Sequence, residues 1–151
     1  MIQKFSVVYA AAVVLLTVAF VWTHLDDWAA ARAHGNAQRL WESREPAAYS
    51  FVYQACSGMC GPPCAARITV TRGEVTDLEG AGECHELDLD SAPTIDAIFE
   101  MEKRDRAAEM TDSFEIRYDP TWGFPAYVVL RCPPGWSDCG TSYEVTDFEE
   151  G

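Results

Sequence analysis

The sequence predicts an α+β domain in which one helix packs on one face of a twisted antiparallel sheet of about six strands. Short runs that alternate apolar and polar residues recur, with turn residues between them. One amphipathic run at helical spacing interrupts these strand-like runs. The chain of 151 residues is 48% hydrophobic and 23% charged, which is the composition of a folded domain. The predicted order of elements is β-β-β-α-β-β-β.

The first three strands form a predicted antiparallel meander. Residues Tyr49–Cys56 place Tyr49, Phe51 and Tyr53 on one face. Residues Arg67–Thr71 alternate in the same way, and Glu74–Leu78 follows after a tight turn at Arg72-Gly73. Glycine supplies the positive φ that hairpin turns require.

The helix and the last three strands follow a loop over residues 79–92. Thr94 is a predicted N-cap, and Ile95, Ile98, Phe99 and Glu102 then share one face of a helix that we expect to end near Met110. The remaining strands are predicted over residues 114–118, 126–132 and 142–148. The run 126–132 is the most apolar of the three, which favours a central place in the sheet.

The N-terminal residues predict a membrane anchor over residues 1–23. Phe5–Trp22 contains no charged residue, and a helix over it would be about 27 Å long, close to the thickness of the hydrocarbon core. Lys4 precedes the run, so we expect a single-pass protein with a cytoplasmic N-terminus and a periplasmic or otherwise extracytoplasmic main domain at the cell membrane. The alternative is a signal peptide cleaved near Ala33.

Residues 24–46 predict a helical stalk between this anchor and the domain. Leu25, Ala29, Ala33, Ala37, Leu40 and Trp41 recur at spacings of three and four. Pro46 ends the pattern. We therefore expect the folded domain to occupy residues 47–151.

The charge balance excludes one class of partner. The formal net charge is −13, whereas nucleic-acid binding requires a basic face that displaces counterions from phosphate.

The six cysteines predict disulfides, since an even number in an exported small domain is typical of a disulfide framework. Cys132 and Cys139 flank a short loop and are the first expected pair. Cys56 and Cys64 end one predicted strand and begin the next, which leaves Cys60 to pair with Cys84. Partners could also be exchanged among these last four cysteines.

The same cysteines permit an alternative, a metal-binding or thiol-redox envelope protein. Cys56, Cys60, Cys64, Cys84 and His85 carry ligand types and spacings that zinc sites use. An oxidising compartment would oxidise these thiols first, so we favour disulfides. Cys60 and Cys64 are separated by three residues on a predicted hairpin loop, unlike the two-residue spacing of a thioredoxin-type site.

Several segments together resemble one bacterial family. They are Tyr49-Ser-Phe, the Arg72-Gly73 turn, Thr94-Ile-Asp-Ala-Ile-Phe99, Tyr118-Asp-Pro-Thr-Trp-Gly-Phe-Pro125 and Tyr143-Glu-Val-Thr-Asp-Phe148. Over residues 47–148 the chain is similar to the exported or membrane-anchored proteins called domain of unknown function 6174. The resemblance implies no catalytic residues.

The Asp119–Pro125 element has a structural and a functional interpretation. As a turn, it would use Pro120 for its fixed φ and Gly123 for a positive φ. As a contact site, it would present Trp122 and Phe124 to a partner. We favour the turn, with both aromatic rings packed over the sheet.

The sequence contains no visible catalytic constellation, because the three histidines are scattered and two of them, His24 and His34, lie in or beside the predicted stalk. We therefore expect a non-catalytic protein without a cofactor. It would be held in the membrane by its N-terminal helix and act through an unidentified envelope protein or in envelope structure.

Overall fold

The computed structural model describes residues 28–57, 64–80, 87–107, 113–135 and 140–151. The chain divides into two compact units, Met1–Asn36 and Ala37–Gly151. Among the described residues, no helix has the length and apolar character needed to cross a membrane. The anchor predicted over residues 1–23 lies outside the described residues.

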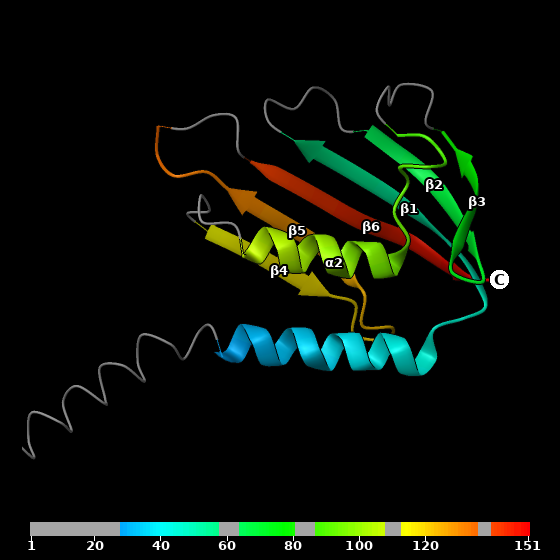
Figure 1. Ribbon diagram of the computed structural model, residues 1–151, viewed down its shortest axis with the longest axis horizontal. Helices are drawn as coiled ribbons and strands as arrows, with labels where there is room; N and C mark the ends of the chain where they lie inside the picture. Colours follow the sequence, from blue (N-terminus) through cyan, green and yellow to red (C-terminus); the bar gives the residue numbers. More distant parts are fainter. Residues whose placement is uncertain (1–27, 58–63, 81–86, 108–112, 136–139) are drawn as a thin grey trace, which may run out of the picture. The chain divides into compact units, whose positions relative to one another are not determined.

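The predicted order of elements in the domain is confirmed (Figure 1). The elements are β1 (Ala48–Ser57), β2 (Cys64–Thr71), β3 (Glu74–Glu79), α2 (Ile95–Arg106), β4 (Ser113–Tyr118), β5 (Pro125–Arg131) and β6 (Thr141–Glu150). A further helix covers residues 28–44.

The six strands form one antiparallel sheet in the order β3-β2-β1-β6-β5-β4. The first strand, β1, pairs with the last, β6, and this pairing joins the two three-stranded halves. The strand expected to be central over residues 126–132 is an inner strand: β5 lies between β6 and β4, second from the edge. Its apolar character agrees with this place, since Val128 is fully buried in the core and its neighbours on the opposite face are half-buried.

The turns and caps follow the local chemistry of the sequence. Arg72 and Gly73 both have positive φ, 55° and 78°, as the tight hairpin between β2 and β3 requires. The side chain of Thr94 caps α2 by accepting a hydrogen bond from the Ala97 amide at 3.2 Å.

Helix α2 is shorter than the sequence suggested. It ends at Arg106 and not near Met110, and the C-cap residue Ala107 donates its amide to the carbonyls of Lys103 and Arg104. Basic side chains in that turn complement the helix dipole.

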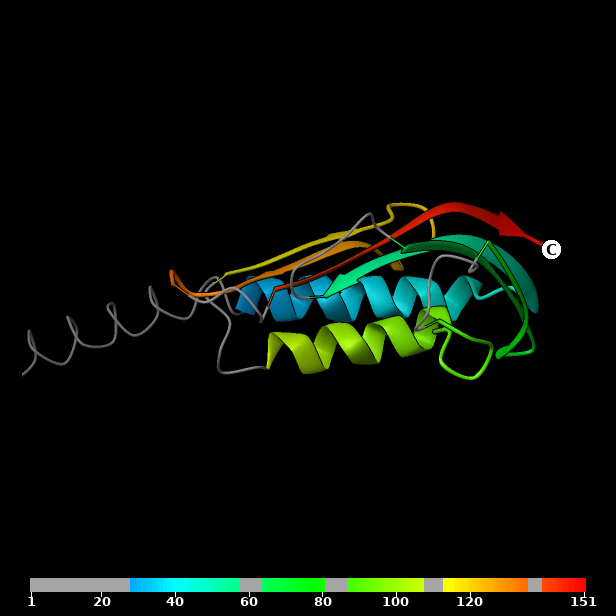
Figure 2. The ribbon, with the colours of Figure 1, turned by 90° about the horizontal axis from the view of Figure 1, so that it is seen from above.

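The core lies between α2 and one face of the sheet (Figure 2). Ile95, Ile98 and Phe99 supply the buried stripe of α2, as predicted, and Glu102 on the same stripe is fully buried. They meet alternate residues of the strands: Tyr49, Phe51, Tyr53, Ile68, Val70, Val128, Tyr143 and Val145.

The helix over residues 28–44 adds a second helix to the layer that covers the sheet, although the sequence predicts a stalk there. Trp41 is fully buried and forms edge-to-face ring pairs with Tyr49 (5.3 Å between centroids) and Phe148 (6.0 Å). Its indole Nε1 donates a hydrogen bond to Asp96 Oδ1 at 3.1 Å. The compact unit therefore begins at Ala37, before the expected boundary at residue 47, and two helices cover the sheet where one was expected. In Figure 2 the C-terminal half of this helix, in cyan, lies on the same side of the sheet as α2.

Candidate functional site

The face of the sheet opposite the two helices is uncovered in the described structure (Figure 2). Residues on this face alternate with the buried core residues of the same strands. Strand register aligns four of them in a row across β1, β6, β5 and β4: Gln54 is opposite Glu144, Glu144 opposite Tyr127, and Tyr127 opposite Arg117. A second row consists of Cys56, Ser142, Val129 and Glu115.

The two rows border a shallow hollow of about 70 Å³. Gln54, Cys56, Tyr127, Ser142 and Glu144 line it, together with Ala55 and Tyr143. The hollow therefore lies over the inner strands β1, β6 and β5. Its lining includes one carboxylate, one side-chain amide, one serine and two tyrosines.

The charged side chains on this face differ in whether they have a neighbour of opposite charge. The guanidinium of Arg117 lies over the Tyr127 ring, 4.1 Å from its centroid, and its Nε is 4.0 Å from Glu115 Oε1. Arg131 Nη2 lies 3.7 Å from the other oxygen of Glu115. Arg67, nearer the opposite edge, has its Nη1 3.7 Å from Glu149 Oε2.

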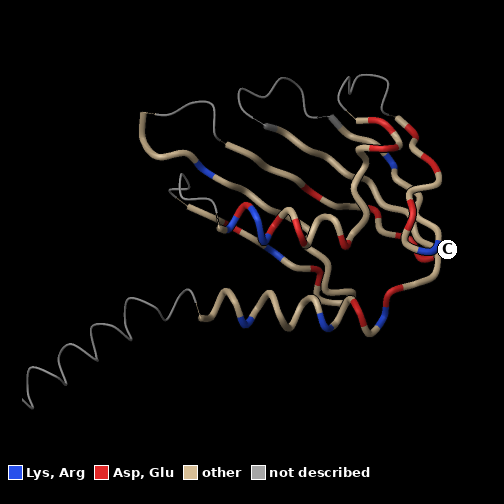
Figure 3. The backbone as a smooth tube through the Cα atoms, viewed as in Figure 1, with Lys and Arg blue, Asp and Glu red and all other residues tan. Residues whose placement is uncertain are grey.

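Glu144, by contrast, is exposed and has no ion pair or hydrogen-bonded side chain among the described residues. It is the charged residue of the hollow. Figure 3 shows the acidic excess of the chain spread over several elements, including the edge strand β3.

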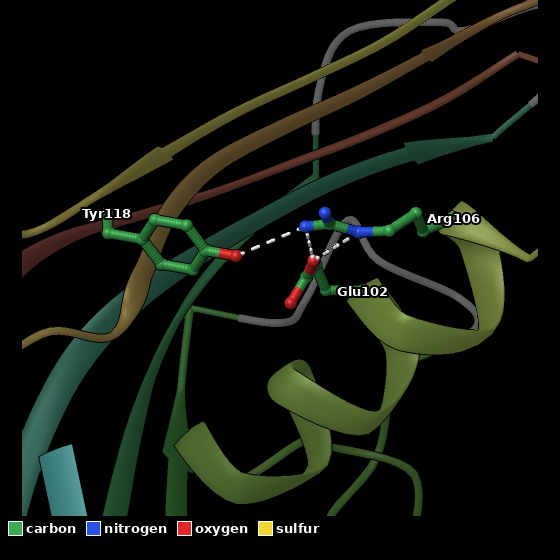
Figure 4. A network of polar contacts seen from close by, with 3 residues as sticks. All are labelled: Glu102, Arg106 and Tyr118. Carbon is green, nitrogen blue, oxygen red and sulfur yellow. Dashed lines mark hydrogen bonds and ion pairs between the residues drawn. The ribbon is translucent and has the colours of Figure 1, made fainter. Parts of the chain in front are cut away.

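A second group of polar side chains lies on the core side of the sheet, between α2 and β4 (Figure 4). Arg106 Nε donates to Glu102 Oε1 at 3.0 Å, a second nitrogen of the same guanidinium also donates to this oxygen, and Nη2 donates to the Tyr118 hydroxyl at 3.3 Å. The same guanidinium lies over the Phe114 ring, 5.2 Å from its centroid. Burial, followed by the charge of Glu102, raises the pKa of Tyr118.

This network ties the last turn of α2 to β4. It contains a matched acid and base but no nucleophile beside a general base, which covalent catalysis would require. We interpret it as structural: it neutralises a carboxylate that has 0% exposure.

The predicted contact residues Trp122 and Phe124 pack against the core. Phe124 is only 3% exposed, and Trp122 is half-buried with its ring 5.0 Å from that of Phe148. Their interpretation as a turn is favoured, and Phe124 is not a surface anchor, because the turn folds it inward beside Trp41.

The turn itself is built by Asp119 and Gly123. Asp119 Oδ1 accepts hydrogen bonds from the amides of Thr121 (2.8 Å) and Trp122 (2.7 Å). Gly123 has the expected positive φ of +88°. A β-carbon there would lie 2.3 Å from the carbonyl oxygen of Ala37, so this glycine also lets the turn approach the helix.

Two of the predicted disulfide cysteines are described with their side chains. Cys56 and Cys132 are each disulfide-bonded, and no described cysteine has a free thiol. Cys60, Cys84, Cys139 and the side chain of Cys64 lie outside the described residues. The pairing expected from the sequence stays a prediction.

The alternative metal site depends on the same residues. Cys60, Cys84 and His85 lie outside the described residues. Cys56 is oxidised, and a disulfide sulfur does not supply the thiolate that zinc prefers. Within the described part of the chain, no group of three or more histidine, cysteine, aspartate or glutamate residues could hold a metal ion.

The residues of the hollow were not singled out by the sequence. Gln54, Tyr127 and Glu144 lie far apart in the chain, and only Glu144 falls in a segment that carries the family resemblance, Tyr143–Phe148. The available signal was strand alternation, which places polar residues away from the core. The pairing of β1 with β6 was needed to bring them together.

Comparison with known proteins identifies the family. The sequence model described as "Family of unknown function (DUF6174)" matches residues 34–150. The chain belongs to the DUF6174 family. No curated protein and no solved structure matches it.

The match confirms the predicted resemblance and begins earlier than expected. The DUF6174 match starts at residue 34, so it includes Trp41 and the helical residues that pack under the sheet. This extent agrees with the compact unit that starts at Ala37.

Proposed function

We propose that this DUF6174 protein is a non-catalytic interaction domain that binds a protein partner through the uncovered face of its sheet. The proposal depends on one observation: helices cover only one face of the sheet. On the other face, the inner strands present half-buried polar and aromatic side chains around a hollow. Aromatic and arginine side chains at the centre of a surface are typical of protein interfaces.

The chemistry of this face favours recognition over turnover. The hollow contains the carboxylate of Glu144, but no described histidine or free thiol accompanies it. Nucleophilic catalysis needs a nucleophile held by an adjacent base. Among the described residues of the hollow, Glu144 has no hydrogen bond to a hydroxyl group, so it activates no nucleophile there.

We further propose that the domain is presented outside the cytoplasm on a single membrane anchor. The uncharged run Phe5–Trp22 supports the anchor. The disulfide-bonded states of Cys56 and Cys132 support an oxidising compartment, since disulfides persist there and are rare in the cytosol. The partner would then be another envelope protein.

Site-specific photo-crosslinking in cells that express the full chain tests the proposed interaction. A photoreactive amino acid at Thr146, exposed on the uncovered face of β6, should give a discrete crosslinked product. The matched control is Leu89, which is 52% exposed in the loop before α2 and should give none. Equal yields at the two positions, or no product at Thr146, would contradict the interaction.

Alkaline extraction of membranes from the same cells tests the proposed location of the protein. The full-length chain should remain in the membrane pellet, and added protease should degrade the domain only from the extracytoplasmic side. Release of a shortened chain into the soluble fraction would instead indicate cleavage near Ala33.

A further inference from the structure

We propose that the partner inserts a lysine or arginine side chain into the hollow, with its cationic group beside Glu144 and against Tyr127. This inference deepens the proposed interaction function and depends on it. It names the chemistry of the partner at the centre of the interface.

The first argument is charge complementarity. The arginines of the uncovered face already have acidic neighbours: Arg117 and Arg131 share Glu115, and Arg67 lies beside Glu149. Glu144 has no such neighbour among the described residues, although it borders the hollow. Asp77 and Glu79 of β3 on this face also form no ion pair among the described residues, but Glu144 is the one that borders the hollow, so a cation is the charge that fits there.

The second argument is the chemistry around that position. In the register of the sheet, Glu144 lies between Gln54 and Tyr127. A carboxylate accepts charge-assisted hydrogen bonds from an ammonium or guanidinium group. An amide oxygen can accept another, and an aromatic ring attracts the same cation through its negative face. Arg117 already lies over one face of the Tyr127 ring, at 4.1 Å, so the partner's cation would use the other face or the ring edge.

The third argument is size, which decides between a side chain and a free small molecule. The hollow measures about 70 Å³. Pockets for small-molecule ligands typically measure about 300–1,000 Å³. The hollow is several-fold smaller than such pockets, which suits the end of one side chain better than a whole ligand. The rest of the partner would lie over the surrounding strands.

The long-range field favours the same partner. A chain with net charge −13 attracts a basic surface and accelerates encounter with it, an effect that salt weakens.

The probe for this inference is a flexible Gly-Ser peptide that carries two arginines, compared with the same peptide carrying two norleucines. Binding to the purified full chain would be followed by amide chemical shifts. We expect the arginine peptide to shift Tyr127, Glu144 and Gln54 and to saturate, and the norleucine peptide to leave them unchanged. Equal binding of both peptides would overturn the inference.

A matched pair of variants separates local from overall charge. Glu144→Gln and Glu149→Gln each remove one negative charge from an exposed position of β6. We expect Glu144→Gln to weaken arginine-peptide binding by at least about threefold, and Glu149→Gln by less than about 1.5-fold, given the usual strength of exposed ion pairs. Equal weakening would reduce the effect to net charge and refute the site. Far-UV circular dichroism would show that both variants fold.

The photo-crosslink at Thr146 distinguishes this inference from the proposed function. A crosslink whose yield falls in Glu144→Gln but not in Glu149→Gln supports both. A crosslink whose yield is unchanged in both variants leaves the interaction in place and refutes the cationic contact. Absence of the crosslink in the unmodified chain refutes the proposed function itself.

Discussion

Replacing Gly123 with alanine tests whether the Asp119–Pro125 turn is specified by close contact with the helix over residues 28–44. Gly123 has a φ of +88°, and its added β-carbon would lie 2.3 Å from the Ala37 carbonyl oxygen and 3.1 Å from the Trp41 amide nitrogen. Both atoms belong to the helix backbone, so a side-chain rotation cannot relieve the clash. Either the turn or the helix must move.

The expected magnitude has two parts. An alanine in the left-handed region costs about 1–2 kcal/mol relative to glycine. Forced movement of packed elements adds about 1–3 kcal/mol, as in overpacked cores. We therefore expect Gly123→Ala to lower the free energy of unfolding by about 2–5 kcal/mol.

Gly73→Ala provides the matched control. Gly73 has a similar φ of +78°, but an added β-carbon there meets no atom within 4 Å. Gly73→Ala should therefore lower the free energy of unfolding only by the backbone part, about 1–2 kcal/mol. Urea unfolding of the purified full chain, followed by far-UV circular dichroism, measures both losses. Equal losses would refute the close-approach argument and leave only backbone strain.

Three further predictions concern the buried polar groups and the turn. Arg106→Met should lower the free energy of unfolding by about 3 kcal/mol, because it leaves the fully buried carboxylate of Glu102 without its cation. The control is Arg104→Met, at a side chain 73% exposed on the same helix. In urea unfolding, this variant should differ from the unmodified chain by no more than about 0.5 kcal/mol. Burial raises the pKa of Tyr53 to about 12, so the folded state holds this proton more tightly than the unfolded chain, whose tyrosine pKa is about 10. The stabilising contribution should be complete below pH 10 and fall by on the order of 2 kcal/mol as the pH rises to about 12, and Tyr53→Phe should reduce this alkaline loss in urea titrations at several pH values. Asp119→Ala should lower the free energy of unfolding by about 1 kcal/mol, because two turn amides lose their hydrogen-bond acceptor. Asp119→Asn keeps an acceptor oxygen and should lower it less. A lower melting temperature for Asp119→Asn than for Asp119→Ala would contradict the role of that oxygen.

Much of the fold could be predicted because local chemistry encodes it. Alternation in β1 identifies Tyr49, Phe51 and Tyr53 as core residues, since strand periodicity does not depend on the rest of the chain. The Arg72-Gly73 turn and the Thr94 cap are equally local. The buried stripe of α2 was also correct, including Glu102.

The role of the helix that contains Trp41 could not be predicted in the same way. Its stripe of small apolar residues is compatible with a stalk and with packing on a sheet. The decision rests on Trp41, whose ring meets Phe124 and Phe148 from distant parts of the chain. Sequence periodicity shows that a helix has an apolar face, but not which surface covers that face.

The candidate site was less predictable than the fold. Glu144 and Tyr127 are ordinary strand residues, and no spacing connects either of them to Gln54. Their proximity follows from antiparallel registers that join β1 to β6 and β6 to β5. A shift of one residue in either register would turn one of these side chains toward the core.

The sequence by itself determined the family, the order of strands and helix, the turn chemistry and the acidic charge, because each depends on residues close together in the chain or on composition. Only the tertiary structure decided that Trp41 belongs to the core, that Phe124 is buried, and that one face of the sheet holds a hollow beside Glu144. These features depend on which segments pair and which surfaces meet. That choice is made by burial of apolar area between elements distant in sequence, and local patterns do not record it.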